Sequence, residues 1–204
     1  MSEPWAPGGD TAHVDHFAAE NLPPKSTWAE MDYKRLPELA ALADRINCAT
    51  ELLDKQAAAH PDRVVLRDNE TTWSYGELLA QANRIAHVLV DDLGVLPGNR
   101  VLLRSGNSPM YAACWFAVMK VGAIAVASMP LLRARELSHM ADFARIGVAL
   151  CAGGLRDELD QARGNSEYLR DIVCFNHPGE DGLEARMAGK PNTFDNVDTA
   201  ADDV

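Results

Sequence analysis

The chain has 204 residues, of which 47% are hydrophobic and 24% are charged, and its formal net charge is −11. This length corresponds to one domain, or to one domain with appendages, and the composition excludes a disordered or collagen-like chain. Because the charge balance is acidic, bulk charge would not hold a nucleic-acid backbone and would repel an anionic membrane surface. We therefore expect neither nucleic acid nor a membrane as a partner.

The first 46 residues are predicted to form an arm that precedes the domain. They contain five prolines and two tryptophans, Trp5 and Trp28, with short helical patterns over 14–20 and 36–46. We expect the arm to pack on the domain surface through its aromatic side chains, and a disordered tail is the alternative. The N-terminus shows no basic stretch followed by an apolar one, so we expect no signal peptide and a cytoplasmic location.

Regular structure is predicted from residue 47 onward. The expected elements are a helix over 47–60, hairpin strands over 64–66 and 71–73, and a helix from 75 to about 91. In the first helix, Leu52 and Leu53 are expected to face inward. Ser74 and Glu77 have the spacing of a capping box, in which each side chain accepts from the other residue's backbone N–H.

Strands and helices then alternate as in a layered α/β fold. Strands are expected over 100–104, 123–128, 148–151 and 172–175, and helices over 109–121, 133–145 and 155–163. The strands are continuously apolar, which indicates burial on both faces of a parallel sheet. The predicted fold class is therefore α/β, a layered parallel sheet with a mixed edge and flanking helices, spanning residues 47–177.

One apolar run could be mistaken for a membrane span. Residues 110–132 carry a single charge, at Lys120, but Gly122 and Pro130 interrupt them. A helix followed by a strand explains this pattern better. In the next helix, Leu137 and Phe143 belong to the expected apolar face, together with Met140.

Residues 178–204 are predicted to be a solvated linker. They hold seven acidic and two basic side chains and almost no large apolar ones. The four cysteines are Cys48, Cys114, Cys151 and Cys174, and no two have the spacing of a CxxC pair. Three lie in apolar runs, so we interpret them as reduced core residues.

A direct search for chemistry finds few signals. The sequence contains no HExxH, GxSxG or GxxxxGK[ST] motif. His13 and His16 are the only histidines with a spacing that suggests a metal, and solvated side chains are the favoured interpretation. Gly153 and Gly154 follow a predicted strand, where α/β sheets place ligand loops, but a simple turn explains them as well.

The order of local motifs is more informative. Residues 72–78 (TWSYGEL) resemble the first signature of the adenylate-forming superfamily, and 93–101 (LGVLPGNRV) resemble its next turn and strand, with Asn99 in place of the usual Asp. Residues 107–109 and 115–123 are similar to its following loop and second signature. The pieces keep the family's order from about 47 to 175. Residues 21–24, Trp28 and 129–137 are most similar to 2-aminobenzoate–CoA ligases, with benzoate–CoA ligases next.

This resemblance implies an ATP-dependent aryl-CoA ligase. Such an enzyme uses ATP and Mg²⁺ to join an aryl carboxylate to AMP, and CoA then displaces AMP. By the same resemblance, Arg156 lies near the CoA 3′-phosphate, and Met129, Pro130 and Leu131 lie near its adenine. An ordinary surface arginine is the alternative for Arg156. The remaining signatures, such as Ser74, Glu77 and Gly122, are expected to be architectural.

The sequence departs from the family in its extent. Residues 178–204 resemble the linker that precedes the family's Ser/Thr/Gly-rich phosphate loop, and that loop and the catalytic Lys are not present in the sequence. We therefore expect an N-terminal subdomain that is inactive by itself and binds no cofactor tightly. We assign no catalytic residue and no metal ligand to this chain. Self-association through exposed apolar surface is expected.

Two other interpretations remain open. The chain could be a stand-alone, non-catalytic α/β binding or interaction module, or part of another adenylate-forming branch such as a peptide-synthetase domain. The reading frame just past Val204 separates the first from a ligase, since a ligase frame would continue into the phosphate loop.

Overall fold

The computed structural model describes residues 11–29, 35–177, 179 and 181–203. Predictions for residues 1–10, including the role of Trp5 and the absence of a signal peptide, lie outside the described residues. In the described ranges, no helix is both long enough and apolar enough to cross a bilayer. The cytoplasmic location stays a prediction.

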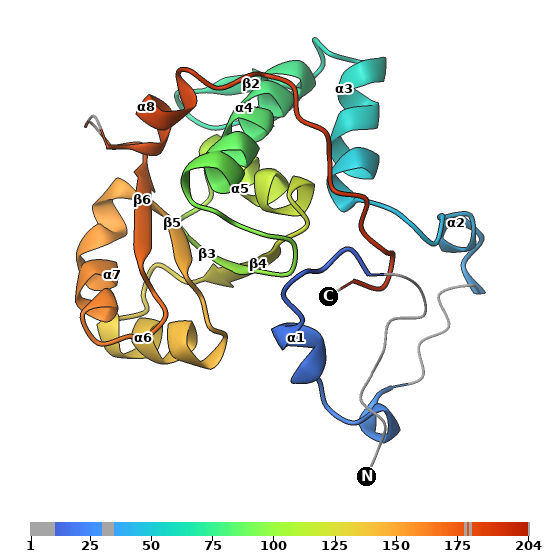
Figure 1. The fold of residues 1–204 in the computed structure, drawn as a ribbon. Helices are drawn as coiled ribbons and strands as arrows, with labels where there is room; N and C mark the ends of the chain where they lie inside the picture. Colours follow the sequence, from blue (N-terminus) through green and yellow to red (C-terminus); the bar gives the residue numbers. More distant parts are fainter. Residues whose placement is uncertain (1–10, 30–34, 178, 180, 204) are drawn as a thin grey trace.

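A four-stranded sheet lies at the centre of the molecule (Figure 1). Its strands are β3 (Arg100–Arg104), β4 (Ile124–Ser128), β5 (Val148–Ala152) and β6 (Asp171–Phe175). They are ordered β4-β3-β5-β6 and all pair in parallel. An antiparallel hairpin of β1 (Val64–Arg67) and β2 (Thr72–Ser74) forms a sheet of its own. The predicted layered α/β fold with a parallel sheet is confirmed.

Helices cover both faces of the sheet (Figure 1). One face packs against α4 (Tyr75–His87), α5 (Pro109–Lys120) and α8 (Leu183–Met187), and the other against α6 (Ala134–Phe143) and α7 (Arg156–Arg163). Successive strand residues point to opposite faces. In β3, Val101 and Leu103 belong to the first core, whereas Leu102 belongs to the second. Burial on both faces explains why the strands are continuously apolar.

The remaining elements are short. They are α1 (Phe17–Glu20), α2 (Pro37–Ala40), α3 (Lys55–Ala59), π-helical turns at Thr50–Asp54 and Val88–Asp92, and 3₁₀ turns at Lys25–Thr27 and Gly153–Leu155. The two helical patterns predicted for the arm therefore shrink to four residues each. The capping box at the start of α4 is confirmed, with the Ser74 amide 2.7 Å from Glu77 Oε2 and the Glu77 amide 3.3 Å from Ser74 Oγ.

Two of the predicted core positions are wrong. Leu52 is 55% exposed, whereas Leu53 is fully buried. Residues Thr50–Asp54 form a wider π-helical turn, which changes the angular phase of the following side chains and leaves only one of the two leucines facing inward. Phe143 is 78% exposed because, six residues after Leu137, it lies about 120° away from Leu137 around the axis of α6, and its ring lies near His139.

The solvated linker predicted for residues 178–204 is also wrong in its described part. Leu183 and Met187 of α8 are buried in the core. Residues 190–203, which we call the C-terminal strap, run across the outside of α4 and α3 and return to the N-terminal arm (Figure 1). Ala12 donates to Asp203 at 3.2 Å, and Arg45 forms a bridge with Ala200. The acidic side chains of the strap suit its position on the surface, and these contacts to the N-terminal arm hold it in place.

The described part of the arm packs on the domain, but not through Trp28, which is 41% exposed. Asp15 accepts from Arg100 Nη1 at 2.5 Å and from Asn99 Nδ2 at 2.9 Å. The ring of Phe17 lies against the guanidinium of Arg145, 4.4 Å from ring centroid to Cζ. Ion pairs, contacts of Phe17 with guanidinium groups, and hydrogen bonds from the backbone of residues 14–15 to Pro97 together hold the arm on the domain.

Candidate functional site

The carboxyl edge of the parallel sheet carries the residues that the sequence singles out for ligand binding. Met129, Pro130 and Leu131 follow β4 directly, and Arg156 follows β5 after a single 3₁₀ turn. In open α/β sheets, the crevice outside the carboxyl ends of the strands is the usual place for a ligand. The structure therefore brings the two predicted groups to one edge.

Arg104, the last residue of β3, connects these two loops. Its side chain is 1% exposed, and its guanidinium donates to the carbonyl oxygens of Met129 (2.8 Å), Pro130 (3.0 Å), Leu132 (2.8 Å) and Leu155 (3.4 Å). No carboxylate in the described residues pairs with it. Burial lowers the pKa of Arg104, although a guanidinium remains charged at neutral pH.

Sequence reasoning assigned no role to Arg104. An arginine at the end of an apolar strand resembles an ordinary boundary residue, and its acceptors are backbone atoms that no motif reports. Its hydrogen bonds join the 129–132 loop to the turn that leads into α7, and Glu158 of α7 adds contacts to Arg133 and to the Ala134 amide. A planar group with five N–H donors suits this task, because several carbonyls can be satisfied at once.

The loop after β4 presents apolar side chains to solvent. Met129 is 62% exposed and Leu131 is 83% exposed, and Pro130 is exposed between them. Arg104 holds the carbonyls of Met129, Pro130 and Leu132, so the backbone of this loop faces inward while the side chains of Met129 and Leu131 face solvent. An exposed apolar turn of this kind offers a surface for a flat aromatic group such as an adenine.

Arg156 is partly engaged within the chain. Its Nε donates to Asp160 Oδ2 at 2.9 Å, and its Nη1 lies 3.8 Å from Cys174 Sγ. The hydrogen bond to Asp160, and then its charge, raises the pKa of Arg156. Its side chain is 38% exposed and lines a hollow of about 130 Å³ with His177. Nη2 forms no hydrogen bond within the described residues, so part of the guanidinium is available to an anion.

Gly153 and Gly154, which follow β5, differ in the space around them. A Cβ at Gly153 would lie 2.6 Å from the Cβ of His177, so glycine is required by close packing. Gly154 faces open space. Neither glycine gives evidence of a phosphate loop.

The cysteines are core residues, as predicted, apart from Cys48, which is exposed. Cys151 and Cys174 are register partners on β5 and β6 with sulfurs 3.4 Å apart. Burial raises the pKa of the Cys114 and Cys151 thiols, so both stay protonated and unreactive at neutral pH. Across the part of the chain that the structure describes, no group of three or more His, Cys, Asp or Glu is arranged to hold a metal.

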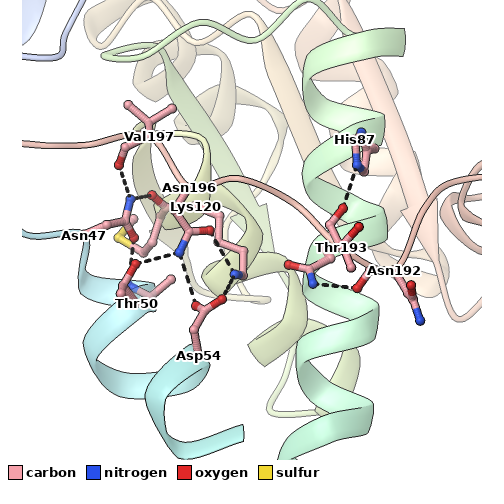
Figure 2. A network of polar contacts seen from close by, with 12 residues as sticks. Asn47, Thr50, Asp54, His87, Lys120, Asn192, Thr193, Asn196 and Val197 are labelled. Carbon is pink, nitrogen blue, oxygen red and sulfur yellow. Dashed lines mark hydrogen bonds and ion pairs between the residues drawn. The ribbon is translucent and has the colours of Figure 1, made fainter. Parts of the chain in front are cut away.

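A second polar cluster fixes the C-terminal strap (Figure 2). Lys120, the last residue of α5, is fully buried and donates to Asp54 Oδ1 at 2.6 Å and to Asn196 Oδ1 at 2.9 Å. Asn196 Nδ2 donates in turn to Thr50 Oγ1 at 2.7 Å and to Asp54 Oδ2 at 3.2 Å. Burial lowers the pKa of Lys120, and the Asp54 carboxylate opposes that shift.

Further contacts continue along the strap (Figure 2). Asn47 Nδ2 donates to the carbonyls of Met119 (2.8 Å) and Val197 (2.9 Å). Asn83 Nδ2 on α4 donates to the Asn192 carbonyl at 2.7 Å. Lys120 lies in the stretch 115–123 that resembles the family's second signature, and its role here is to attach the strap to the sheet-covering helices.

A larger apolar hollow, of about 690 Å³, lies beside the edge strand β4. Its lining includes Leu42, Leu52, Trp115, Met119 and Ile124, with His13 and Asp203 at its polar side. It is the kind of surface through which self-association was expected, but self-association stays a prediction.

Comparison with known proteins relates this architecture to a family. The model of the family described as AMP-binding enzyme matches residues 53–204. A benzoate–CoA ligase from Thauera aromatica is 25% identical over 178 residues, 87% of this chain and 34% of that protein. A salicyl-AMP ligase/salicyl-S-ArCP synthetase from Mycobacterium tuberculosis is 39% identical over 153 residues, 70% of this chain and 27% of that protein.

Solved structures show the same fold. An anthranilate CoA ligase, AuaEII, in complex with anthranoyl-AMP superimposes with a TM-score of 0.75 at 22% identity, over 85% of this chain and 32% of that one. A benzoate CoA ligase from Burkholderia xenovorans LB400 gives a TM-score of 0.65 at 20% identity, over 77% of this chain and 30% of that one. The chain thus spans about a third of the length of these four proteins. The part that superimposes on the two solved structures has the same fold as they do.

Proposed function

The chain belongs to the AMP-binding enzyme family of adenylate-forming ligases, and on this premise we propose that it is the N-terminal part of a ligase that activates an aryl carboxylate with ATP. The observation that carries the proposal is the likeness to two relatives named for aromatic acids, benzoate and salicylate. We propose 2-aminobenzoate as the substrate, with CoA as the acceptor.

The proposed reaction has two halves. The carboxylate attacks the α-phosphate of ATP, which gives an acyl-adenylate and pyrophosphate, and the CoA thiol then displaces AMP to form the thioester. ATP is paired with Mg²⁺, which screens the phosphate charge. No residue of this chain is assigned to Mg²⁺ or to the adenylation step.

The contribution of this chain is proposed to be on the CoA side. Arg156 keeps Nη2 free, and Met129 and Leu131 present exposed apolar surface at the same edge of the sheet. A guanidinium offers a planar, permanently charged fork to a phosphate. We propose that Arg156 contacts the CoA 3′-phosphate and that the turn at 129–131 contacts the adenine.

Arg156→Ala in the complete ligase is expected to raise the KM for CoA by about tenfold, because one charge-assisted hydrogen bond is lost. Aryl-acid-dependent ATP–pyrophosphate exchange, which reports the first half-reaction, should not change. Arg163→Ala is the matched control, since Arg163 also pairs with Asp160, at 3.1 Å, from the same helix. An unchanged KM for CoA in the Arg156 variant, or an equal rise in both variants, would refute the assignment.

A second candidate acceptor has its own support. The salicyl-AMP ligase relative is more similar in identity, at 39%, than the benzoate–CoA ligase, at 25%. That relative is named as a salicyl-S-ArCP synthetase as well as a salicyl-AMP ligase, so a carrier-protein thiol is the alternative to CoA.

The test uses the protein encoded by the complete reading frame and a panel of aryl acids. We expect 2-aminobenzoate to give ATP–pyrophosphate exchange and, with CoA, a thioester, and we expect the 204-residue chain alone to give no exchange. Thioester formation on a carrier protein but not on CoA would favour the alternative. Exchange by the 204 residues alone would contradict their expected inactivity, and a native stop codon after Val204 with no exchange would contradict the ligase proposal.

A further inference from the structure

A charged hollow opens at the amino ends of the parallel strands, at the opposite edge of the sheet from Arg156. Its volume is about 230 Å³, and the segments that lead into β3, β5 and β6 line it. The charged side chains of its lining are Arg100, Arg145, Arg170 and Asp15. Three cations and one carboxylate leave a local surplus of two positive charges, in a chain whose net charge is −11.

Asp15 neutralises Arg100 and leaves the other two arginines uncompensated. Arg100 is 6% exposed, and its Nη1 lies 2.5 Å from Asp15 Oδ2. Partial burial opposes ionisation of Asp15, but the Phe17 amide and the Arg100 guanidinium hold the pKa of Asp15 below its ordinary value. The remaining donors of Arg100 are used by the carbonyls of Gly98, Ala144 and Arg145.

Arg145 is held in place by aromatic rings rather than by an anion. It has φ of 49° at the end of α6, a left-handed position where glycine is usual. Its guanidinium lies 4.4 Å from the Phe17 centroid and 5.7 Å from the Tyr168 centroid. Contact with ring faces leaves the N–H edges open, and the side chain makes no hydrogen bond or ion pair with any described residue.

Arg170 occupies space that a glycine leaves for it. Its Nη2 lies 3.0 Å from the place where a Cβ at Gly147 would stand, and the Gly147 carbonyl accepts from the Arg170 amide at 3.0 Å. Within the described residues, this guanidinium also lacks a hydrogen-bond acceptor and a carboxylate. Arg145 and Arg170, both exposed, therefore line one hollow with the donors of their guanidinium groups unused.

We propose that this hollow binds the phosphate group of a small phosphate monoester. A doubly charged phosphate matches the surplus of two charges, and its oxygens can accept from two arginines at once, whereas a carboxylate carries one charge and two oxygens. The proposal is independent of the proposed ligase chemistry, because the hollow lies at the other end of the strands from the CoA-side residues.

The test is titration of the 204-residue chain with inorganic phosphate at constant ionic strength, followed by the ¹H–¹⁵N signals of the arginine side chains. We expect saturating shifts at Arg145 and Arg170. Arg170→Met should weaken phosphate binding by about tenfold, the value of one charge-assisted hydrogen bond. Arg135→Met, which removes the same charge from the exposed side of α6, should leave the affinity unchanged.

A second variant and two other ligands complete the binding test. Arg145→Lys keeps the charge and removes the planar fork, and it should weaken binding while the chain keeps its wild-type circular dichroism. A phosphate monoester such as glycerol phosphate should bind at least as tightly as inorganic phosphate, and acetate should bind more weakly. Shifts that do not saturate, equal losses in the Arg170 and Arg135 variants, acetate binding as tight as phosphate, or rejection of the monoester would each overturn the proposal.

Discussion

Arg104→Met is expected to destabilise the fold by about 3 kcal/mol, because the carbonyls that Arg104 satisfies would lose their donors at once. The side chain is 1% exposed and reaches four carbonyl oxygens in two loops. Methionine fills a similar volume without a donor, so the loss reports the hydrogen bonds rather than a cavity. Urea unfolding followed by circular dichroism measures the change.

The same variant should release both loops locally. Amide hydrogen exchange under native conditions should rise more in residues 129–133 and 153–156 than in α4, which Arg104 does not touch. Arg104→Lys keeps the charge but cannot place donors at all the carbonyls, so an intermediate loss is expected. An unfolding midpoint equal to that of the wild type in the methionine variant would show that the carbonyls find other donors and that Arg104 does not organise this edge.

The layered sheet could be predicted because its signals are local. Residues 148–151 are apolar at every position, which only burial on both faces explains, and Ser74 with Glu77 marks a helix start within four residues. Such features depend on spacing along the chain. Leu52 was assigned to the wrong side because a single π-helical turn, which has no sequence signature, changes the phase of the residues after it.

The carboxyl edge could be predicted only in part. Met129 and Arg156 follow strands, so parallel pairing places them together. Arg104 was missed because its partners are backbone carbonyls, and Arg145 and Arg170 were missed because their significance depends on the carboxylates they lack. An acidic segment such as 190–203 resembles a linker in sequence, since the hydrogen bonds of Asn196 to buried partners leave no periodic pattern.

Lys120→Met is expected to have the second large effect, a loss of about 2–3 kcal/mol. Lys120 is fully buried, and its removal leaves Asp54 and Asn196 without their cation. Breaking a buried pair by removing one partner usually costs about 3–5 kcal/mol, but the Asp54 side chain is 27% exposed, so water can solvate the carboxylate that remains. Urea unfolding measures the loss, and limited proteolysis within 190–203 reports release of the strap.

The pair, rather than either charge alone, is what the fold requires. If so, Lys120→Met combined with Asp54→Leu should be more stable than Lys120→Met alone, because no unpaired carboxylate then faces the core. Lys55→Met is the control: Lys55 pairs with Glu51 on the surface, its side chain is 61% exposed, and its loss should stay within about 0.5 kcal/mol. A double variant less stable than the single one would show that Asp54 holds Asn196 by itself, and that Lys120 only fills space at the end of α5.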